Sequence, residues 1–209
     1  MAKIKLTKGE LKRQRDSLKQ FQHYLPTLQL KKQQLQMKIL EARRILSEKQ
    51  KELQILETDI ARWVGLLADP QLPADVNLSR WLTPTTVDVE TINIAGANVP
   101  YLKDVSFPPE DYDLYLTPYW VDVALEQLRS FMKALVETLV IQKQIAILGK
   151  ELRVTTQRVN LFEKIKIPEA LDNIRKIRIY LGDQQANAVG ISKVAKHKVE
   201  LKVLLEVGV

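Results

Sequence analysis

Cysteine is absent from this chain of 209 residues, and histidine occurs only twice. Disulfide bonds and sites that bind metals through thiolates are therefore excluded; a reducing compartment is compatible with this composition but not required by it. His23 and His197 lie far apart in the sequence, and neither has a carboxylate or second ligand at metal-binding spacing. Neither indicates a zinc site or a catalytic triad.

Long apolar runs are also missing. Met1 to Lys19 alternates charged and apolar side chains without the apolar centre of a signal peptide. Nowhere does an uncharged apolar run approach the ~18 residues that a membrane span needs. We expect neither secretion through a standard signal nor a direct membrane span.

Proline is scarce outside the middle of the chain. Of nine prolines, only Pro26 and Pro168 fall outside residues 70–118. Because proline breaks helices, the segments on either side are predicted to be long helices, each bent or locally interrupted at its proline. The predicted plan is an N-terminal coiled-coil helix at 1–69, a connector at 70–117, and a C-terminal coiled-coil helix with a tail at 118–209.

A heptad repeat runs through the first long segment. Its a and d places are Leu11, Gln14, Leu18, Phe21, Leu25, Leu28, Lys32, Leu35, Ile39, Ala42, Leu46, Lys49, Leu53, Leu56, Ile60, Trp63 and Leu67. Only Gln14, Lys32 and Lys49 among them are polar. A period of 3.5 held over this length predicts the seam of a coiled coil.

The second long segment is less regular. Thr117 is a suitable N-cap, with Pro118 at the first helical position and Asp122 in the first turn. Its apolar frame slips around residues 142–149 and resumes after Pro168. The three frames are Val121, Leu125, Leu128, Met132, Leu135 and Leu139; then Ile145, Leu148, Leu152, Val159 and Phe162; then Ala170, Ile174, Ile177 and Leu181.

The two segments match in length, so we expect them to pair within one chain. Antiparallel pairing sets Leu11 near Ile174 and Lys32 near Arg153. The tail beyond Leu181 then overhangs the N-terminus, interrupted by Gly182 and Gly190.

The connector carries a period-two pattern from Thr86 to Ile94, a turn at residues 95–98, and a return from Val99 to Val105. This pattern predicts a β-hairpin at about 87–105, in which Pro100 favours an edge strand. Its apolar and aromatic positions are Val87, Val89, Ile92, Ile94, Tyr101 and Leu102. The predicted fold class is mainly α, a long antiparallel two-helix coiled coil with a small β-hairpin in the connector.

Residues 119–148 are apolar on more than one face. The side chains left over once the seam is filled are Phe131, Val136, Val140, Ile141 and Ile147. Either a second protein covers them or the connector folds back over them, and the sequence leaves both open.

The net charge of +7 gathers near the chain ends. Basic residues of the N-terminal segment are Lys3, Lys5, Lys8, Lys12, Arg13, Arg15 and Lys19, and those of the tail are Lys193, Lys196, Lys198 and Lys202. In an antiparallel pair these charges meet at one end, which favours an acidic partner. A solvated helix end is the other interpretation of the same charges.

Catalytic patterns are absent. Gly149-Lys150 lacks the remainder of a phosphate-binding loop, since residue 144 is Gln and residue 151 is Glu. The carboxylates Glu126, Glu137 and Glu163 lie in helical sequence, where a solvated face or an ion pair is expected. We predict no enzymatic activity and no cofactor for this chain.

Several stretches resemble the D subunits of V-type rotary ATPases. They are T-K-G-E-L at Thr7 to Leu11 followed by Arg13 and Arg15, T-Q-R-V-N at Thr156 to Asn160, I-P at Ile167 and Pro168, and I-R-K-I-R at Ile174 to Arg178. Their order and spacing fit the family over the whole chain. The tail departs from it, because residues 182–187 are followed by sparse lysines instead of a compact basic run. Contacts that relatives make through this tail are therefore not carried over.

The resemblance implies a non-catalytic central rotor shaft in the cytoplasm, peripheral to the membrane. Its expected partners are a ring of catalytic and regulatory subunits that splits ATP, a small central-stalk subunit, and a subunit linking to the membrane rotor. Expected ring contacts are Lys5, Lys8, Lys12, Arg13, Arg15, Arg175 and Arg178. Expected small-subunit contacts are the five surplus apolar residues, and the hairpin is expected to modulate turnover or assembly.

Two other classes stay open. A generic coiled-coil tether would form parallel homodimers. A nucleic-acid-binding arm would use the basic N-terminus, but no nucleic-acid-binding fold or array of stacking aromatics accompanies those lysines, so we expect no nucleic-acid partner.

Overall fold

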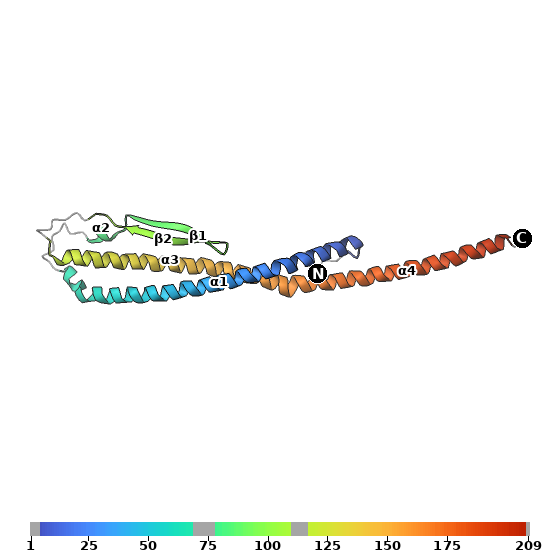
Figure 1. The fold of residues 1–209 in the computed structure, drawn as a ribbon, viewed down its shortest axis with the longest axis horizontal. Helices are drawn as coiled ribbons and strands as arrows, with labels where there is room; N and C mark the ends of the chain where they lie inside the picture. The colour runs from blue at the N-terminus through green and yellow to red at the C-terminus, as the bar shows by residue number, and fades with distance from the viewer. Residues whose placement is uncertain (1–4, 69–77, 110–116, 208–209) are drawn as a thin grey trace. The chain divides into compact units, whose positions relative to one another are not determined.

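The computed structural model describes residues 5–68, 78–109 and 117–207 (Figure 1). The elements in these residues are α1 (Lys8–Trp63), the 3₁₀-helix η1 (Val64–Ala68), α2 (Leu78–Leu82), β1 (Thr86–Ile94), β2 (Ala97–Ser106), α3 (Trp120–Leu161), the π-helix η2 (Phe162–Lys166) and α4 (Ile167–Val207). The chain is therefore mainly α with a two-stranded antiparallel hairpin between long helices, which confirms the predicted fold class.

The chain divides into two compact units. We call residues 1–30 together with 156–209 the terminal unit, and residues 31–155 the central unit. Both contain a part of α1 and a part of α3.

The heptad prediction holds along α1 and into η1. From Leu11 to Leu67, all the predicted a and d places are buried or half-buried, and most other positions are exposed. Leu35 and Ile39 are the most buried, at 0% and 7% exposure. Pro26 lies inside α1, and the α-helix continues on both sides of it.

The Thr7 side chain caps the start of α1. The backbone N–H of Glu10 donates to Oγ1 of Thr7 at 3.3 Å, and the N–H of Leu11 donates to the Thr7 carbonyl at 3.0 Å. The spacing of Thr7 and Glu10 is the one that satisfies free N–H groups at a helix start.

Antiparallel pairing is visible in the central unit. Trp63 Nε1 donates to Gln127 Oε1 at 2.7 Å, whereas Lys31 lies 4.0 Å from a carboxylate oxygen of Glu151. Residue numbers thus fall along α1 as they rise along α3. Intramolecular antiparallel pairing argues against a tether built as a parallel homodimer.

The start and the seam of α3 differ from the prediction in detail. The helix begins at Trp120, after a turn in which the N–H of Val121 donates to the Pro118 carbonyl at 3.0 Å. Leu139 was predicted on the seam but is 53% exposed, and Thr138 is buried instead. The slip therefore comes earlier than expected, and it is tolerated because the Thr138 hydroxyl donates to the Ala134 carbonyl at 2.8 Å.

The hairpin packs on the long helices through β2. Ala97 and Val99 are 3% and 1% exposed and join Leu35, Ile39 and Leu148 in one core cluster. The side-chain amide of Gln144 donates to the Pro100 carbonyl at 2.6 Å, which satisfies a backbone acceptor of this edge strand. The connector therefore folds back over α1 and α3.

The turn of the hairpin is tight. Ala95 and Gly96 both have positive φ, 50° and 78°, as two-residue hairpin turns require. The Asn93 side chain stabilises the turn by accepting from the Gly96 N–H at 3.0 Å. A side chain at residue 96 would also be crowded, because its Cβ would lie 3.2 Å from Nζ of Lys31.

In the terminal unit, α1 packs against the end of α3, η2 and the first part of α4. The rings of Phe21 and Phe162 stack with centroids 5.2 Å apart. Beyond η2, Ala170, Ile174 and Ile177 are buried, as the third apolar frame predicts. Pro168 is the second residue of α4, so the predicted local change in helical bonding lies in η2, just before this proline.

The predicted interruption of the tail at Gly182 and Gly190 is wrong. Both glycines lie within α4, which continues to Val207. A single glycine in a helix costs only ~1 kcal/mol relative to alanine, and alanine and glutamine, which favour helices, lie near these two. The helix therefore continues, and its side chains from 182 to 202 are exposed.

Candidate functional site

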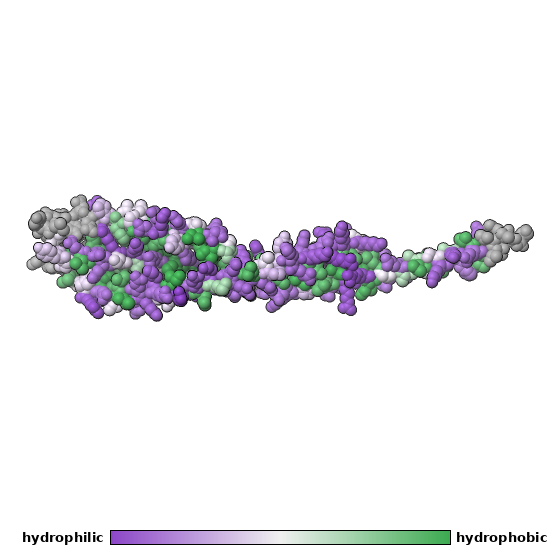
Figure 2. Space-filling view, in the orientation of Figure 1, coloured by the Kyte–Doolittle hydropathy of each residue, from purple (hydrophilic) through white to green (hydrophobic). Residues whose placement is uncertain are grey.

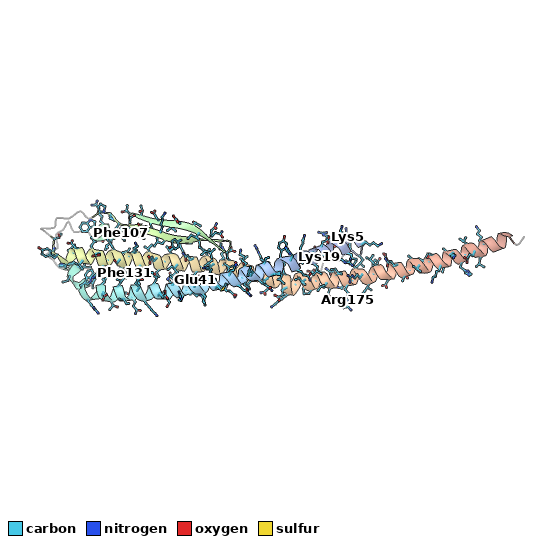
Figure 3. The ribbon with its side chains drawn as sticks, viewed as in Figure 1. Lys5, Lys19, Glu41, Phe107, Phe131 and Arg175 are labelled. Carbon is cyan, nitrogen blue, oxygen red and sulfur yellow. The ribbon has the colours of Figure 1, made fainter. Side chains whose placement is uncertain are left out.

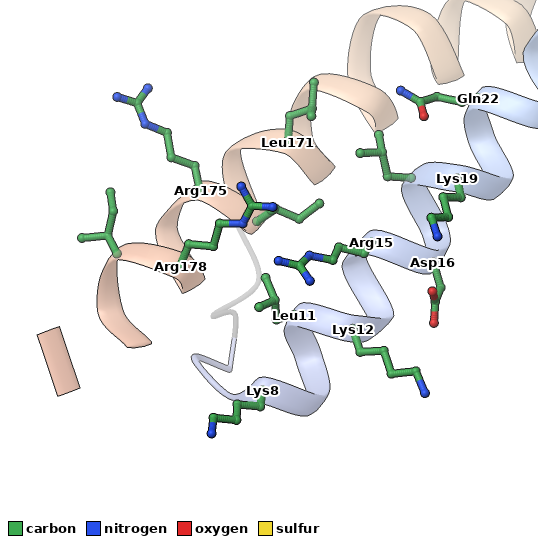
Figure 4. A pocket seen from close by; sticks show the side chains of 13 residues that line it. Lys8, Leu11, Lys12, Arg15, Asp16, Lys19, Gln22, Leu171, Arg175 and Arg178 are labelled. Carbon is green, nitrogen blue, oxygen red and sulfur yellow. The ribbon is translucent and has the colours of Figure 1, made fainter. Parts of the chain in front are cut away.

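Basic residues of α1 and of the first part of α4 meet in the terminal unit. The tail lysines Lys193, Lys196, Lys198 and Lys202, which were expected to join them, lie farther along α4 and do not line the groove. Between α1 and α4 lies an open groove with a volume of about 840 Å³, which we call the basic groove (Figure 4). Its lining residues are Lys8, Leu11, Lys12, Arg15, Asp16, Leu18, Lys19, Gln22, Leu171, Ile174, Arg175, Arg178 and Ile179. Figure 4 shows Arg15 reaching from α1 toward α4, where Arg175 and Arg178 lie.

The charge of this groove is hardly compensated. Asp16 is the one acidic side chain in its lining, against four cations from α1 and two from α4. Within the described ranges, none of these six cations forms an ion pair. Several like charges around one concave surface create a positive potential that attracts an acidic partner and weakens with salt.

A second groove lies in the same unit. Its volume is about 520 Å³, and we call it the polar groove. It is lined by Lys5, Glu10, Arg13, Gln14, Ser17, Phe21, Lys166, Glu169, Ala170 and Asn173. Figure 3 labels Lys5, Lys19 and Arg175 in this unit, and Figure 2 shows hydrophilic side chains over much of its visible face.

The structure brings all the predicted ring-contact residues to these two grooves. Lys5 and Arg13 line the polar groove, and Lys8, Lys12, Arg15, Arg175 and Arg178 line the basic groove. Among the lining residues that were not predicted as contacts are Lys19 and Asn173. Helical spacing from Lys12 and Arg15 could have indicated Lys19, whereas nothing in the sequence indicated that Asn173 lines a groove.

The surplus apolar residues of α3 divide into two groups. Ile147 packs against the core cluster beneath the hairpin, and Ile141 lines a cleft of about 250 Å³ between the helices and the hairpin. The sequence left open whether a second protein or the connector covers the surplus apolar residues. For Ile141 and Ile147, the hairpin of the connector does so. Phe131, Val136 and Val140 are half-buried, so each still presents apolar surface.

The hairpin side chains that were singled out lie at different depths. Ile94 and Leu102 are half-buried, whereas Val87, Val89, Ile92 and Tyr101 are 41–52% exposed. Ile92 and Tyr101 border the same cleft as Ile141. The hairpin therefore leaves apolar side chains at the surface even after it has packed on α3.

Two ionisable groups of the central unit have shifted pKa values. The hydrogen bond from Lys38 to Glu41, at 2.8 Å, lowers the pKa of the Glu41 carboxyl (Figure 3). The hydrogen bond to Glu137, reinforced by Glu52, raises the pKa of Lys49. Both shifts come from ion pairs, and ion pairs of this kind hold structure together as readily as they mark chemistry.

Residues considered for catalysis occupy ordinary structural positions. Glu137 pairs with Lys49 at 2.9 Å, and Gly149-Lys150 lies inside α3, not after a strand. In the described parts of the chain, no cluster of His, Asp and Glu has the makings of a metal site. None of the helices described has a stretch apolar and long enough to cross a membrane.

Comparison with known proteins gives a consistent result. The family model of the ATP synthase D subunit matches residues 10–197. The V-type ATP synthase D subunit of Borreliella burgdorferi is 46% identical over 196 residues, which cover 94% of this chain and 95% of the relative. The proteins of the same name from Chlamydia pneumoniae and Chlamydia trachomatis serovar L2 are 35% and 33% identical over 199 residues, which cover 95% of this chain and 94% and 97% of those relatives.

Proposed function

Because the chain belongs to the family of ATP synthase D subunits, we propose that it is the central rotor shaft of a V-type ATP synthase. In this role it couples ATP hydrolysis or synthesis in a ring of catalytic and regulatory subunits to ion transport by a membrane rotor. The ring binds and splits ATP, and the shaft is not catalytic. The complex lies at the cytoplasmic side of the membrane.

The observation that carries the proposal is the gathering of basic residues in the terminal unit. Cations separated by more than 150 residues in sequence, such as Lys8 and Arg175, line one groove. Leaving so many like charges close together and without ion pairs costs stability, unless an acidic partner compensates them. We infer that the terminal unit enters the ring and meets acidic side chains there.

Torque transmission requires helices that do not slide or separate. The unbroken seam of α1, with Leu35 and Ile39 at its centre, supplies stiffness through close packing. The basic groove and the polar groove give the terminal unit two unlike faces. Each ring position meets a different face as the shaft turns. The resulting difference in contact energy biases the catalytic sites of the ring toward different conformations.

Two further partners are expected besides the ring. The small central-stalk subunit would bind the central unit. Phe131, Val136 and Val140 on α3 offer half-exposed apolar surface for the small central-stalk subunit. Ile141 and Ile147 are partly covered by the hairpin and would contribute only through the surface that it leaves exposed. A further subunit links the shaft to the membrane rotor.

The hairpin is proposed to modulate turnover or assembly. Removing it entirely is a poor test, because Ala97 and Val99 complete the core around Leu35. The exposed side chains of Val89 and Tyr101 are better targets. Replacing both by alanine should alter ATP turnover or assembly of the complex while the helical content stays the same.

The decisive experiment neutralises the five N-terminal cations Lys5, Lys8, Lys12, Arg13 and Arg15 to glutamine. The control neutralises five cations of the central unit, Arg43, Arg44, Lys51, Lys143 and Lys150. Both variants lose the same net charge. The terminal variant is expected to bind the ring at least tenfold more weakly at low salt and to show a smaller salt dependence, since each charge pair it loses is screened by salt.

The control variant should bind the ring as the wild type does. Equal ring binding and equal coupled ATP turnover for the terminal variant and the wild type would contradict the proposed role. Equal losses in both variants would show that net charge matters and that the grooves do not.

A further inference from the structure

Asn173 on α4 has an unusual environment. It is 7% exposed and lines the polar groove. In the part of the chain that the structure describes, its side-chain amide makes no hydrogen bond. The amide atoms of Asn173 are not enclosed, because they do not belong to the fully buried unsatisfied polar atoms of the described residues, and they open onto the groove. An amide that faces a groove without a partner in the chain is available to bond a polar group of a ligand.

The π-helix η2 puts Asn173 at the groove. Continued α-helical spacing from Val159 and Phe162 would bring Lys166, Glu169 and Asn173 onto the seam. The i to i+5 bond from the Ile167 N–H to the Phe162 carbonyl adds one residue to the turn. Ala170, Ile174 and Ile177 take the seam instead, and Asn173 moves to its margin beside the groove.

The charged groups of the groove are unequally paired. Glu10 accepts a hydrogen bond from Gln14 at 2.9 Å, and Glu169 lies 3.4 Å from Nζ of Lys166. Lys5 and Arg13 form no ion pair within residues 5–68, 78–109 and 117–207. The groove thus offers a guanidinium, an ammonium and an amide N–H₂, and its two carboxylates, Glu10 and Glu169, bond to Gln14 and Lys166 instead of to these three groups.

We propose that the polar groove receives an aspartate or glutamate side chain of a ring subunit. Arg13 pairs with the carboxylate, Lys5 adds a second positive charge, and the Asn173 amide donates a hydrogen bond to it. The proposal rests on the proposed function, because the ring supplies the carboxylate. Beyond that function, it specifies that the ring subunit presents a carboxylate, and it assigns Asn173 a role in binding that group.

The groove suits a carboxylate better than a phosphate. Arginine binds a planar carboxylate through two parallel hydrogen bonds. Glu10 and Glu169 lie in the same lining and would repel a doubly charged anion more strongly than a singly charged one. Phe21 and Ala170 contribute apolar surface that excludes water from a hydrogen-bonded pair.

A carbodiimide cross-link on the assembled complex of full-length chain and ring tests the contact directly. This reagent joins an amine to a carboxylate that touches it, so Lys5 should form an isopeptide bond with an Asp or Glu of a ring subunit. Lys5→Arg is the matched control, because it keeps the charge but has no amine to couple. It should lose the cross-link and keep the affinity.

Binding measurements with Arg13→Gln and Asn173→Ala test how much each side chain contributes to the affinity for the ring. Each should weaken ring binding, by about tenfold for Arg13→Gln and several-fold for Asn173→Ala, as expected for a charged hydrogen bond lost in an interface. Asn173→Asp should weaken it further than Asn173→Ala by repelling the partner carboxylate. The thermal midpoint of the free chain identifies any variant that has lost its fold, and Arg44→Gln on the central unit should bind like the wild type.

The outcomes separate the two proposals. If the wild type binds the ring but Lys5 forms no isopeptide bond with it, or if Arg13→Gln and Asn173→Ala bind like the wild type, the carboxylate contact is wrong and the shaft role stands. Cross-linking of Lys5 only to Glu10 or Glu169 of its own chain would also overturn the contact. A folded wild-type chain that does not bind the ring overturns both.

Discussion

At the scale of single residues, the charge at one seam position, Lys49, has a partner across the helix pair. Lys49 occupies a d place of the heptad, where an apolar side chain is the rule. Its ammonium lies 2.9 Å from Glu137 on α3 and 3.0 Å from Glu52 on its own helix. Its side chain is 34% exposed, so the stem is covered while the charged end reaches water and its two partners.

Glu137→Gln is expected to lower the free energy of unfolding by about 0.5–1 kcal/mol, because the pair is partly exposed. Chemical denaturation of both proteins at neutral pH measures the difference. Glu48→Gln, which removes a 3.7 Å exposed pair with Arg44, serves as the control and should change stability by no more than a few tenths of a kcal/mol. A loss as large for Glu48→Gln as for Glu137→Gln would contradict the special role of the Lys49 pair.

The pH dependence of this contribution follows from the raised pKa of Lys49. A folded-state pKa above the unfolded value means that the stabilisation is fully present below the unfolded pKa of about 10.4 and is lost as pH rises through the folded pKa. The difference between wild type and Glu137→Gln should therefore be constant from neutral pH to about pH 10 and shrink above it. A difference that already disappears between pH 7 and pH 9 would contradict the assignment to Lys49.

At the scale of elements, η2 corrects the seam and accommodates a proline. Pro168 has no N–H, and its ring would clash with the carbonyl four residues earlier in a continuous α-helix. The wider turn at Phe162–Lys166 precedes Pro168 and shifts the seam by one residue. The π-helical turn η2 thus both accommodates Pro168 and produces the change of apolar frame.

Deleting Lys164 together with Pro168→Ala tests this account. The deletion removes the extra residue, so a continuous α-helix would still bring Ile167, Ala170 and Ile174 to the seam. The thermal midpoint of the double variant should stay close to that of the wild type, whereas the deletion with Pro168 retained should lose about 3 kcal/mol. Deleting Lys150, which lies in regular α-helix, shifts the frame on one side of it and should destabilise the protein strongly.

If the Lys164 deletion with Pro168→Ala were as unstable as the Lys150 deletion, η2 would not be the device that restores the seam. Circular dichroism of each variant at low temperature checks that helix content is retained before the midpoints are compared.

The sequence predicted the regular parts of these elements and missed what depends on long-range contacts. The seam of α1 follows from one uninterrupted repeat, and the hairpin from its alternation and its turn, predicted at residues 95–98 and found at Ala95 and Gly96. The exposure of Leu139 could not be read from periodicity, because Thr138 is a poor seam residue until its hydroxyl bonds to Ala134. The position of the hairpin over Ile147 depends on packing between segments about 50 residues apart, for which local patterns carry no signal.

The same limit applies to the candidate site. Charge counting predicted that the N-terminal cations would meet the tail lysines 193–202, but the cations of α4 that line the groove with Lys8 are Arg175 and Arg178, because the tail continues beyond the groove as a helix. It could not separate Arg13 and Lys5 from the others. Arg13 takes its groove from its face of α1, Lys5 lies before the helix where periodicity gives no position, and η2 sets which face of α4 borders each groove.

At the scale of the whole molecule, the two units have different compositions. The central unit holds the core cluster, the hairpin and the ion pairs of Lys31 and Lys49 with α3. The terminal unit holds the two grooves and the uncompensated cations. These differences support the proposal that the terminal unit binds the ring and the central unit binds the small central-stalk subunit.

The central claim is that this chain turns within the ring as its shaft. The chain has no cysteine, so Lys12→Cys provides a single site for a photo-cross-linker joined through a reducible disulfide. After the complex is assembled and illuminated, steady-state ATP hydrolysis by the ring should fall in proportion to the cross-linked fraction, and a reductant should restore it. Unchanged hydrolysis in a fully cross-linked complex would contradict the claim.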